Sequence, residues 1–185
     1  MKQRSWRWEW LPDQGSGSEL FEYEASTAGH TLRGKIVANL EGAGIEASYV
    51  VEADATWRTK RVRVEVANLK RVLDISANGI GRWSDSGGTW IPALDGCIDV
   101  DISLTPATNT LPIRRLDPPL GAGAEIKVAY VLAPELSLRA GPQRYTRIGD
   151  RLWRFNGLDI NFTADISVDE DGFVVDYPGL FHRAS

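Results

Sequence analysis

Apolar and polar residues alternate along most of the chain, and this pattern is the first indication of its fold. In residues 61–66, three valines alternate with Arg61, Arg63 and Glu65. A repeat of two residues is typical of a β-strand that has one face in the core and the other in solvent. The pattern therefore predicts a largely antiparallel sheet whose strands each have one buried and one exposed face. The same repeat occurs in residues 6–10, 49–57, 98–104, 126–132 and 160–168.

Turn signals separate these alternating runs. Asn78-Gly79 and Asp171-Gly172 each lie between two such runs, and both dipeptides favour tight β-hairpins. Further glycine-containing turns occur in residues 15–17, 42–44, 86–88 and 121–123. The spacing of these signals predicts about eleven to fifteen short strands.

One segment, Thr105–Leu116, departs from the alternation. Three threonines near its start are suitable helix N-caps, and Pro112 is tolerated in a first helical turn. We therefore expect a helix to begin near residues 108–110. Two arginines would lie in its last turn, where cations suit the helix dipole, and Pro118-Pro119 would end it.

The balance of many strands and one short helix narrows the fold class. An open sheet of this length must roll or close to bury its apolar face. We expect a mainly β fold, a barrel, half-barrel or rolled sheet, with the helix inside it. No shift in composition marks a boundary, so residues 1–185 should form a single domain.

Composition and charge exclude several classes of function. The formal net charge of −4 argues against a nucleic-acid partner, which favours a basic surface. No run approaches the roughly 20 apolar residues of a membrane span, and the N-terminus does not read as a secretory signal. Cys97 is the only cysteine, which rules out an internal disulfide and fits a reducing compartment. We therefore expect a cytoplasmic protein.

Two acidic residues precede the predicted helix, and two arginines lie in its last turn. Asp99 and Asp101 are two residues apart on one strand, so their carboxyl groups share a face. They suit an acid–base pair or a cation site, or else a solvated strand face paired with arginines. Arg114 and Arg115 could grip a phosphate or carboxylate. We favour the internal alternative, a structural charge cluster of Asp99, Asp101, Arg114 and Arg115 that seats the helix on the sheet.

Aromatic and basic residues also alternate in residues 57–61, 143–147 and 153–155, as they do in sites that stack on sugars or bases. Ordinary core and surface positions of a strand produce the same pattern more often. His30 and His182 are the only histidines, which leaves little for a catalytic triad or a zinc site. We expect no catalytic residues, no metal and no cofactor.

Several motifs, taken together, run nearly the whole chain in order. The block GCIDVD at residues 96–101, followed by TPATNTLPIRRL at residues 105–116, resembles the bacterial putative glycolipid-binding family, formerly a domain of unknown function. The resemblance implies a spiral β-roll, in which a long antiparallel sheet wraps around one helix, and a homodimer. It carries over no catalytic residues. Further matches are residues 49–54, Trp57-Arg58, Gly81-x-Trp83, Gln143-Arg144-Tyr145 and residues 176–181.

Three functions remain open at this point. The first is a non-enzymatic protein that binds a glycolipid or another amphipathic small molecule, in transport or metabolism, with aromatic residues stacking on sugar rings. The second is a dimeric structural or interaction protein without a small ligand. The third, and the least favoured, is a hydrolase acting on a sugar or lipid-linked substrate. For the binder, the candidate ligand-binding residues are Trp57, Arg58, Trp83, Arg114, Arg115, Tyr145 and Trp153.

Overall fold

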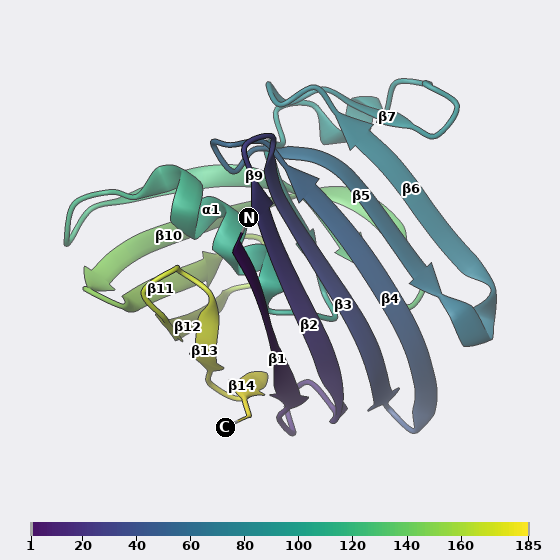
Figure 1. The fold of residues 1–185 in the computed structure, drawn as a ribbon, viewed down its shortest axis with the longest axis horizontal. Coiled ribbons are helices and arrows are strands. Elements are labelled where there is room, and N and C mark those ends of the chain that lie inside the picture. Colours follow the sequence, from purple (N-terminus) through teal and green to yellow (C-terminus); the bar gives the residue numbers. More distant parts are fainter. Residues whose placement is uncertain (1, 185) are drawn as a thin grey trace.

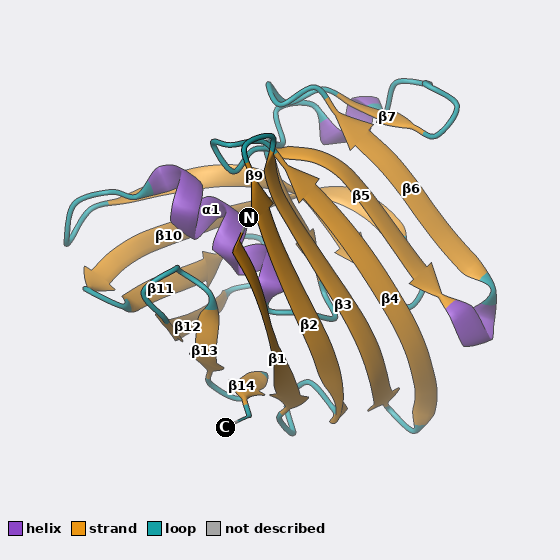
Figure 2. Ribbon diagram, in the orientation of Figure 1, coloured by secondary structure: helices purple, strands orange, loops and turns teal. Residues whose placement is uncertain are grey.

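The computed structural model describes residues 2–184, and its main feature is one sheet of fourteen strands (Figures 1 and 2). The strand order is β7-β6-β5-β4-β3-β2-β1-β14-β13-β12-β11-β10-β9-β8. The strands are β1 (Lys2–Trp10), β2 (Ser16–Ser26), β3 (Gly29–Leu40), β4 (Ala43–Ala53), β5 (Thr59–Val66), β6 (Arg71–Ala77), β7 (Trp83–Asp85), β8 (Asp99–Ile102), β9 (Gly123–Leu132), β10 (Ser137–Gly149), β11 (Leu152–Gly157), β12 (Phe162–Val168), β13 (Val174–Tyr177) and β14 (Phe181–Arg183).

The chain begins in the middle of this sheet. Strands β1 to β7 run outward as successive hairpins, and the last strand, β14, pairs with the other side of β1. Strands β13 back to β8 then form the second half. All pairs are antiparallel except β8 with β9, which is parallel. Both predicted hairpins are present, with Asn78-Gly79 between β6 and β7 and Asp171-Gly172 between β12 and β13.

The one α-helix among residues 2–184 is α1 (Thr110–Leu116), and it follows the 3₁₀ turn η3 (Ala107–Asn109). Its position and its end agree with the prediction, and both arginines lie in its last turn. The capping does not agree. The N-cap is Asn109, which makes no side-chain cap, since its amide is bonded to Tyr145. Thr108, a predicted cap, directs its hydroxyl toward β8 instead.

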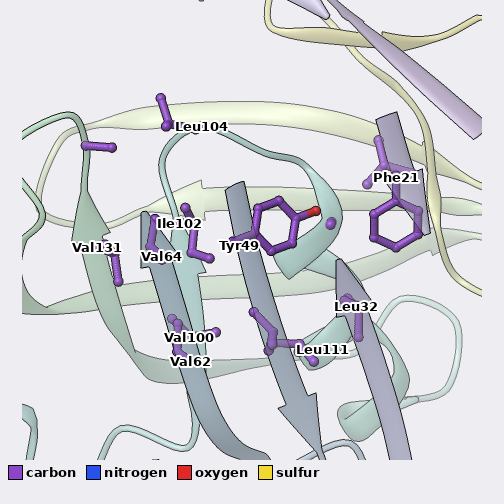
Figure 3. Close-up of a cluster of buried hydrophobic side chains, with 14 of the residues drawn as sticks. Phe21, Leu32, Tyr49, Val62, Val64, Val100, Ile102, Leu104, Leu111 and Val131 are labelled. Carbon is purple, nitrogen blue, oxygen red and sulfur yellow. The ribbon is translucent and has the colours of Figure 1, made fainter. Parts of the chain in front are cut away.

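The helical segment contacts both halves of the sheet. Tyr49 of β4 is hydrogen bonded to Thr105 at 3.1 Å, and Asn109 donates to the Tyr145 hydroxyl of β10 at 2.8 Å. In Figure 1, α1 lies between the N-terminal strands and the fainter strands β9 and β10. Side chains fill the space beside it, and Figure 3 labels Leu111 of α1 near Val62 and Val100. The core is therefore shared by both halves and the helix.

The sheet does not close. Its two edge strands, β7 and β8, are not paired with each other, and the sheet is not strongly curled. The expectation of one long, mostly antiparallel sheet with one short helix is confirmed, whereas the expected rolling of that sheet into a barrel, half-barrel or spiral β-roll is not. The outward backbone N–H groups of β8 are instead met by side chains. Val100 donates to the Thr59 hydroxyl at 3.2 Å, and Ile102 donates to the Thr108 hydroxyl at 3.3 Å.

The buried faces of β1 and β8 differ in how well they match the alternation in the sequence. The alternating tryptophans of β1 point into the core, where Trp8 is fully buried and Trp6 packs on Phe21. The prediction that the aspartate-bearing face of β8 lies in solvent is wrong, since the Asp99 side chain is fully buried. The reason is the helical segment, which covers the face of β8 that carries its aspartates.

Candidate functional site

A pocket of about 240 Å³ lies on the face of the second half-sheet that carries Asp101. The strand register builds this face. Asp101, Tyr130 and Arg139 are direct neighbours across β8, β9 and β10 and form one row. Gln143 and Gly157 are neighbours across β10 and β11 and lie in a second row. Since opposed residues of adjacent strands point to the same side, all five line the pocket.

One wall of the pocket is polar. The Gln143 side-chain amide donates to Asp101 Oδ2 at 2.5 Å, and the Thr108 hydroxyl donates to Asp101 Oδ1 at 3.3 Å. Burial raises the pKa of Asp101, and these two hydrogen bonds oppose the rise. The Gln143 Oε1 atom is buried and has no hydrogen-bond partner among residues 2–184. The wall therefore holds an acceptor that still lacks a donor.

The opposite wall is aromatic. Phe155, Phe162 and Tyr177 line the pocket, together with Phe181. The ring centroids of Phe155 and Tyr177 are 6.1 Å apart, and those of Tyr177 and Phe181 are 6.2 Å apart. Such a surface packs well against the apolar face of a ring. The pocket thus has one polar and one apolar side.

Two glycines line the pocket. A Cβ atom on Gly141 would meet Tyr130 and Val128 at 3.4 Å, an ordinary contact, so a side chain there would grow into the pocket. A Cβ on Gly157 would approach the Ile160 side chain at 2.8 Å. Neither glycine has a positive φ, so the chain does not need glycine there for backbone reasons. The missing side chain of Gly141 therefore leaves the hollow open, whereas the space beside Gly157 is filled by Ile160, which itself lines the pocket.

The mouth of the pocket combines an ion pair and exposed apolar side chains. Arg139 and Asp159 form a close ion pair across the rim. Ile160, which also lines the pocket, is 58% exposed, and its neighbour Leu158 is 45% exposed. An apolar chain leaving the pocket would pass over these two side chains.

The predicted charge cluster divides into two parts. Arg115 forms an ion pair with Asp99, with contacts of 2.6 Å and 3.0 Å. Asp101 instead bonds to an amide and a hydroxyl, and Arg114 is exposed with its guanidinium 5.5 Å from the Trp57 ring centre. A cluster of four residues is therefore corrected to one ion pair, because the last turn of α1 directs only Arg115 toward β8.

The predicted ligand-binding residues are brought together only in part, since Arg114 lies over the Trp57 ring and shares a hollow with Trp153. The four aromatic ones are all buried, and none of the seven lines the pocket described above. Arg114 and Trp153 share a separate hollow of about 160 Å³. Tyr145 reaches the pocket indirectly, through its hydrogen bond with Asn109. Trp83 donates to the Cys97 carbonyl at 2.7 Å, and Arg58 donates to the Gly79 carbonyl at 2.8 Å.

Trp57 has an unusual setting within that set. Its φ of 66° lies in the left-handed region, which a bulky residue rarely adopts. Its ring stacks on His30 at 3.7 Å, and the Tyr23 hydroxyl is hydrogen bonded to His30 Nδ1 at 2.9 Å. Burial lowers the pKa of His30. Stacking and burial together explain how this backbone conformation is held.

Arg139 is a pocket residue that no sequence motif indicates, and Gln143 belongs to the Gln143-Arg144-Tyr145 match without being predicted as a site residue. Gln143 alternates with Tyr145, which places both on one face of β10. That alternation was visible in the sequence, but the partner strand and the opposing wall were not. Asp101 is predicted from the sequence as part of the structural charge cluster, with an acid–base pair or a cation site as the alternative.

Two classes of site find no support among residues 2–184. No three His, Cys, Asp or Glu side chains are grouped so that they could hold a metal ion. No helix in this range is long and apolar enough to span a membrane. The pocket is instead suited to non-covalent binding of a ligand that has a hydroxyl-bearing and an apolar part.

Comparison with known proteins gives the same picture at family level. A family model described as "Putative glycolipid-binding" matches residues 7–183. A crystal structure of a DUF1089 family protein from Pseudomonas aeruginosa is 36% identical and superposes with a TM-score of 0.80, over 90% of this chain and 92% of that one. No curated protein matches the chain. The chain belongs to the Putative glycolipid-binding family.

Proposed function

We propose that this protein binds an amphipathic small molecule of the glycolipid class, without catalysis, in the pocket beside α1. The observation that carries the proposal is that a polar wall and an aromatic wall face each other across the pocket. Asp101 and Gln143 offer hydrogen-bonding groups on one side, and Phe155 and Phe162 offer aromatic rings on the other. Sugar rings have hydroxyls around their edge and an apolar face, and they match such a pair of walls.

The pocket's size indicates which part of the ligand it takes. Sites that enclose a whole drug-sized ligand measure roughly 300–1,000 Å³. The 240 Å³ of this pocket suits a head group of about one ring. The exposed side chains of Leu158 and Ile160 give an apolar path for the rest of the molecule. We therefore assign the head group to the pocket and the hydrocarbon to its rim.

The alternatives fit less well. A structural or interaction protein without a small ligand would have a solid interior, whereas here the helix leaves a lined pocket. The homodimer and the cytoplasmic location stay predictions.

The test fills the pocket at Gly141. Gly141→Leu places its new side chain in the hollow after an ordinary Cβ contact, and Gly44→Leu is the matched control, since a Cβ at Gly44 meets nothing within 4 Å. Binding of n-octyl glucoside, below its micelle-forming concentration, is measured by isothermal titration calorimetry. We expect Gly141→Leu to weaken binding at least ~10-fold and the control to leave it unchanged.

Native mass spectrometry before and after organic extraction gives an independent readout. Lipid carried through purification should be present on the wild type and on Gly44→Leu, and lost from Gly141→Leu. Thermal melts of both variants show whether each remains folded. Wild-type protein that never retains lipid and gives no heat with the glucoside would refute the proposal.

A further inference from the structure

The polar wall of the pocket is rich in acceptors and carries no unpaired cation. Its ionisable residues are Asp101, Arg139 and Asp159. Arg139 is already neutralised by Asp159. The remaining acidic group is the Asp101 carboxyl, which is held inside the wall by Gln143 and Thr108. A ligand that enters would thus meet a carboxyl group rather than a free guanidinium.

The hydrogen-bonding capacity of the wall points the same way. A carboxylate only accepts, so the Gln143 group facing Asp101 must be the NH₂ end. Oε1 is the other end of the amide and is enclosed by protein atoms. The Gln143 amide and the Thr108 hydroxyl are thus both directed at Asp101, and an anionic head group finds no free cation in this wall.

From these two observations, and building on the function proposed above, we infer that the pocket selects an uncharged, hydroxyl-bearing sugar ring and rejects anionic head groups. An anion beside Asp101 would bring two like charges together in a site shielded from water, which is costly. A neutral ring avoids this cost. The aromatic wall then packs against its apolar face.

This selectivity differs from the expectation that arginines would meet an anionic head group. Arg58 and Arg115 are engaged elsewhere, with Gly79 and Asp99 respectively, and neither lines the pocket. Arg114 lies in the separate hollow beside Trp153. The cations of this chain therefore lie away from the place where the head group is proposed to bind.

The experiment compares two ligands that differ in one group. n-Octyl glucoside and n-octyl glucuronide share a ring and a chain, and only the second carries a carboxylate, which is ionised at about pH 7.5. Calorimetry on the wild type should give at least ~10-fold tighter binding of the glucoside. In Asp101→Asn the two affinities should come within about threefold, because the charge is gone and an amide can also donate.

The outcomes separate this inference from the proposed function. If both ligands bind the wild type equally, and Gly141→Leu weakens both, the pocket binds head groups and the selectivity is refuted. A glucoside preference that persists unchanged in Asp101→Asn refutes the role of that residue. If neither ligand binds the wild type, the proposed function fails and this inference with it. The wild-type comparison decides the question even if Asp101→Asn does not fold.

Discussion

The two halves of the sheet each bury one carboxyl group completely, and they stabilise it in different ways. In the second half, Asp99 receives two contacts from the Arg115 guanidinium. In the first half, Glu19 of β2 receives the Tyr49 hydroxyl, and its Oε2 has no partner among residues 2–184. Burial raises the pKa of Glu19 to about 8, although the hydrogen bonds from Tyr49 and Thr105 oppose the rise.

The comparison of Asp99 with Glu19 shows two ways in which the negative charge of a buried carboxyl group can be cancelled. Asp99 is matched by a cation on the helix, so this pair ties α1 to β8. Glu19 has no cation to pair with and holds a proton through the neutral range instead. The first arrangement depends on a side-chain partner, and the second depends on pH. Substitutions should therefore affect the two halves in different ways.

Removing the partner of Asp99 should have the largest effect. Arg115→Met leaves Asp99 buried and unpaired, and we expect the free energy of unfolding to fall by about 3–5 kcal/mol. Arg114→Met is the matched control. It loses only an exposed cation–π contact with Trp57, worth about 0.5–1 kcal/mol. Urea denaturation followed by tryptophan fluorescence measures both. Equal losses in the two variants would contradict the single ion pair and favour the four-residue cluster.

The Glu19 site depends on space as well as on hydrogen bonding. Gly34 of β3 is paired with Tyr49, and a Cβ there would lie 2.2 Å from the Tyr49 ring and 2.5 Å from Glu19 Oε1. Gly34→Ala should cost about 1–3 kcal/mol of unfolding free energy, since the ring must move. Gly44→Ala, in the open, should cost little. A Gly34→Ala protein as stable as the wild type would mean that Tyr49 is free to shift.

The pH dependence of stability gives the most specific test. Between about pH 4.5 and about pH 8 the folded protein keeps the Glu19 proton and the unfolded chain loses it, so stability should fall as pH rises. Glu19→Gln keeps a hydrogen-bonding group at every pH and should remove that part of the slope. Glu22→Gln, exposed on the same strand, serves as the control. Unfolding free energies at several pH values measure the slopes, and identical slopes in wild type and Glu19→Gln would rule out a proton on Glu19.

Local patterns predicted much of this fold. Period-two alternation located most strands, and the break at Thr105–Leu116 located α1, because both signals depend on neighbours along the chain. Glu19 shows the limit. In residues 18–21 the sequence offers Leu20 for the core, yet Leu20 is 47% exposed and Glu19 is fully buried. Phe21 and Tyr23 fix the strand face, and Glu19 follows them inward.

The pocket was harder to predict than the strands. Asp101 and Gln143 meet because β8 pairs in parallel with β9, after the chain passes through the helical segment. The hollow exists because Gly141 on β10 lacks a side chain. These features depend on register between distant segments, which no local pattern records. The aromatic and basic runs drew attention to positions that are mostly core.

The hydroxyl groups of Thr59 and Thr108 along strand β8 have a consequence for how copies of this protein meet. An edge strand with free N–H groups is a template on which another chain can add a strand, in assembly or in aggregation. Here the outward N–H groups of Val100 and Ile102 are already bonded within the molecule. A second copy approaching this edge finds no open backbone donors at these positions. Contact there would have to rely on side chains, so the fourteen-stranded sheet is not extended by another strand at β8.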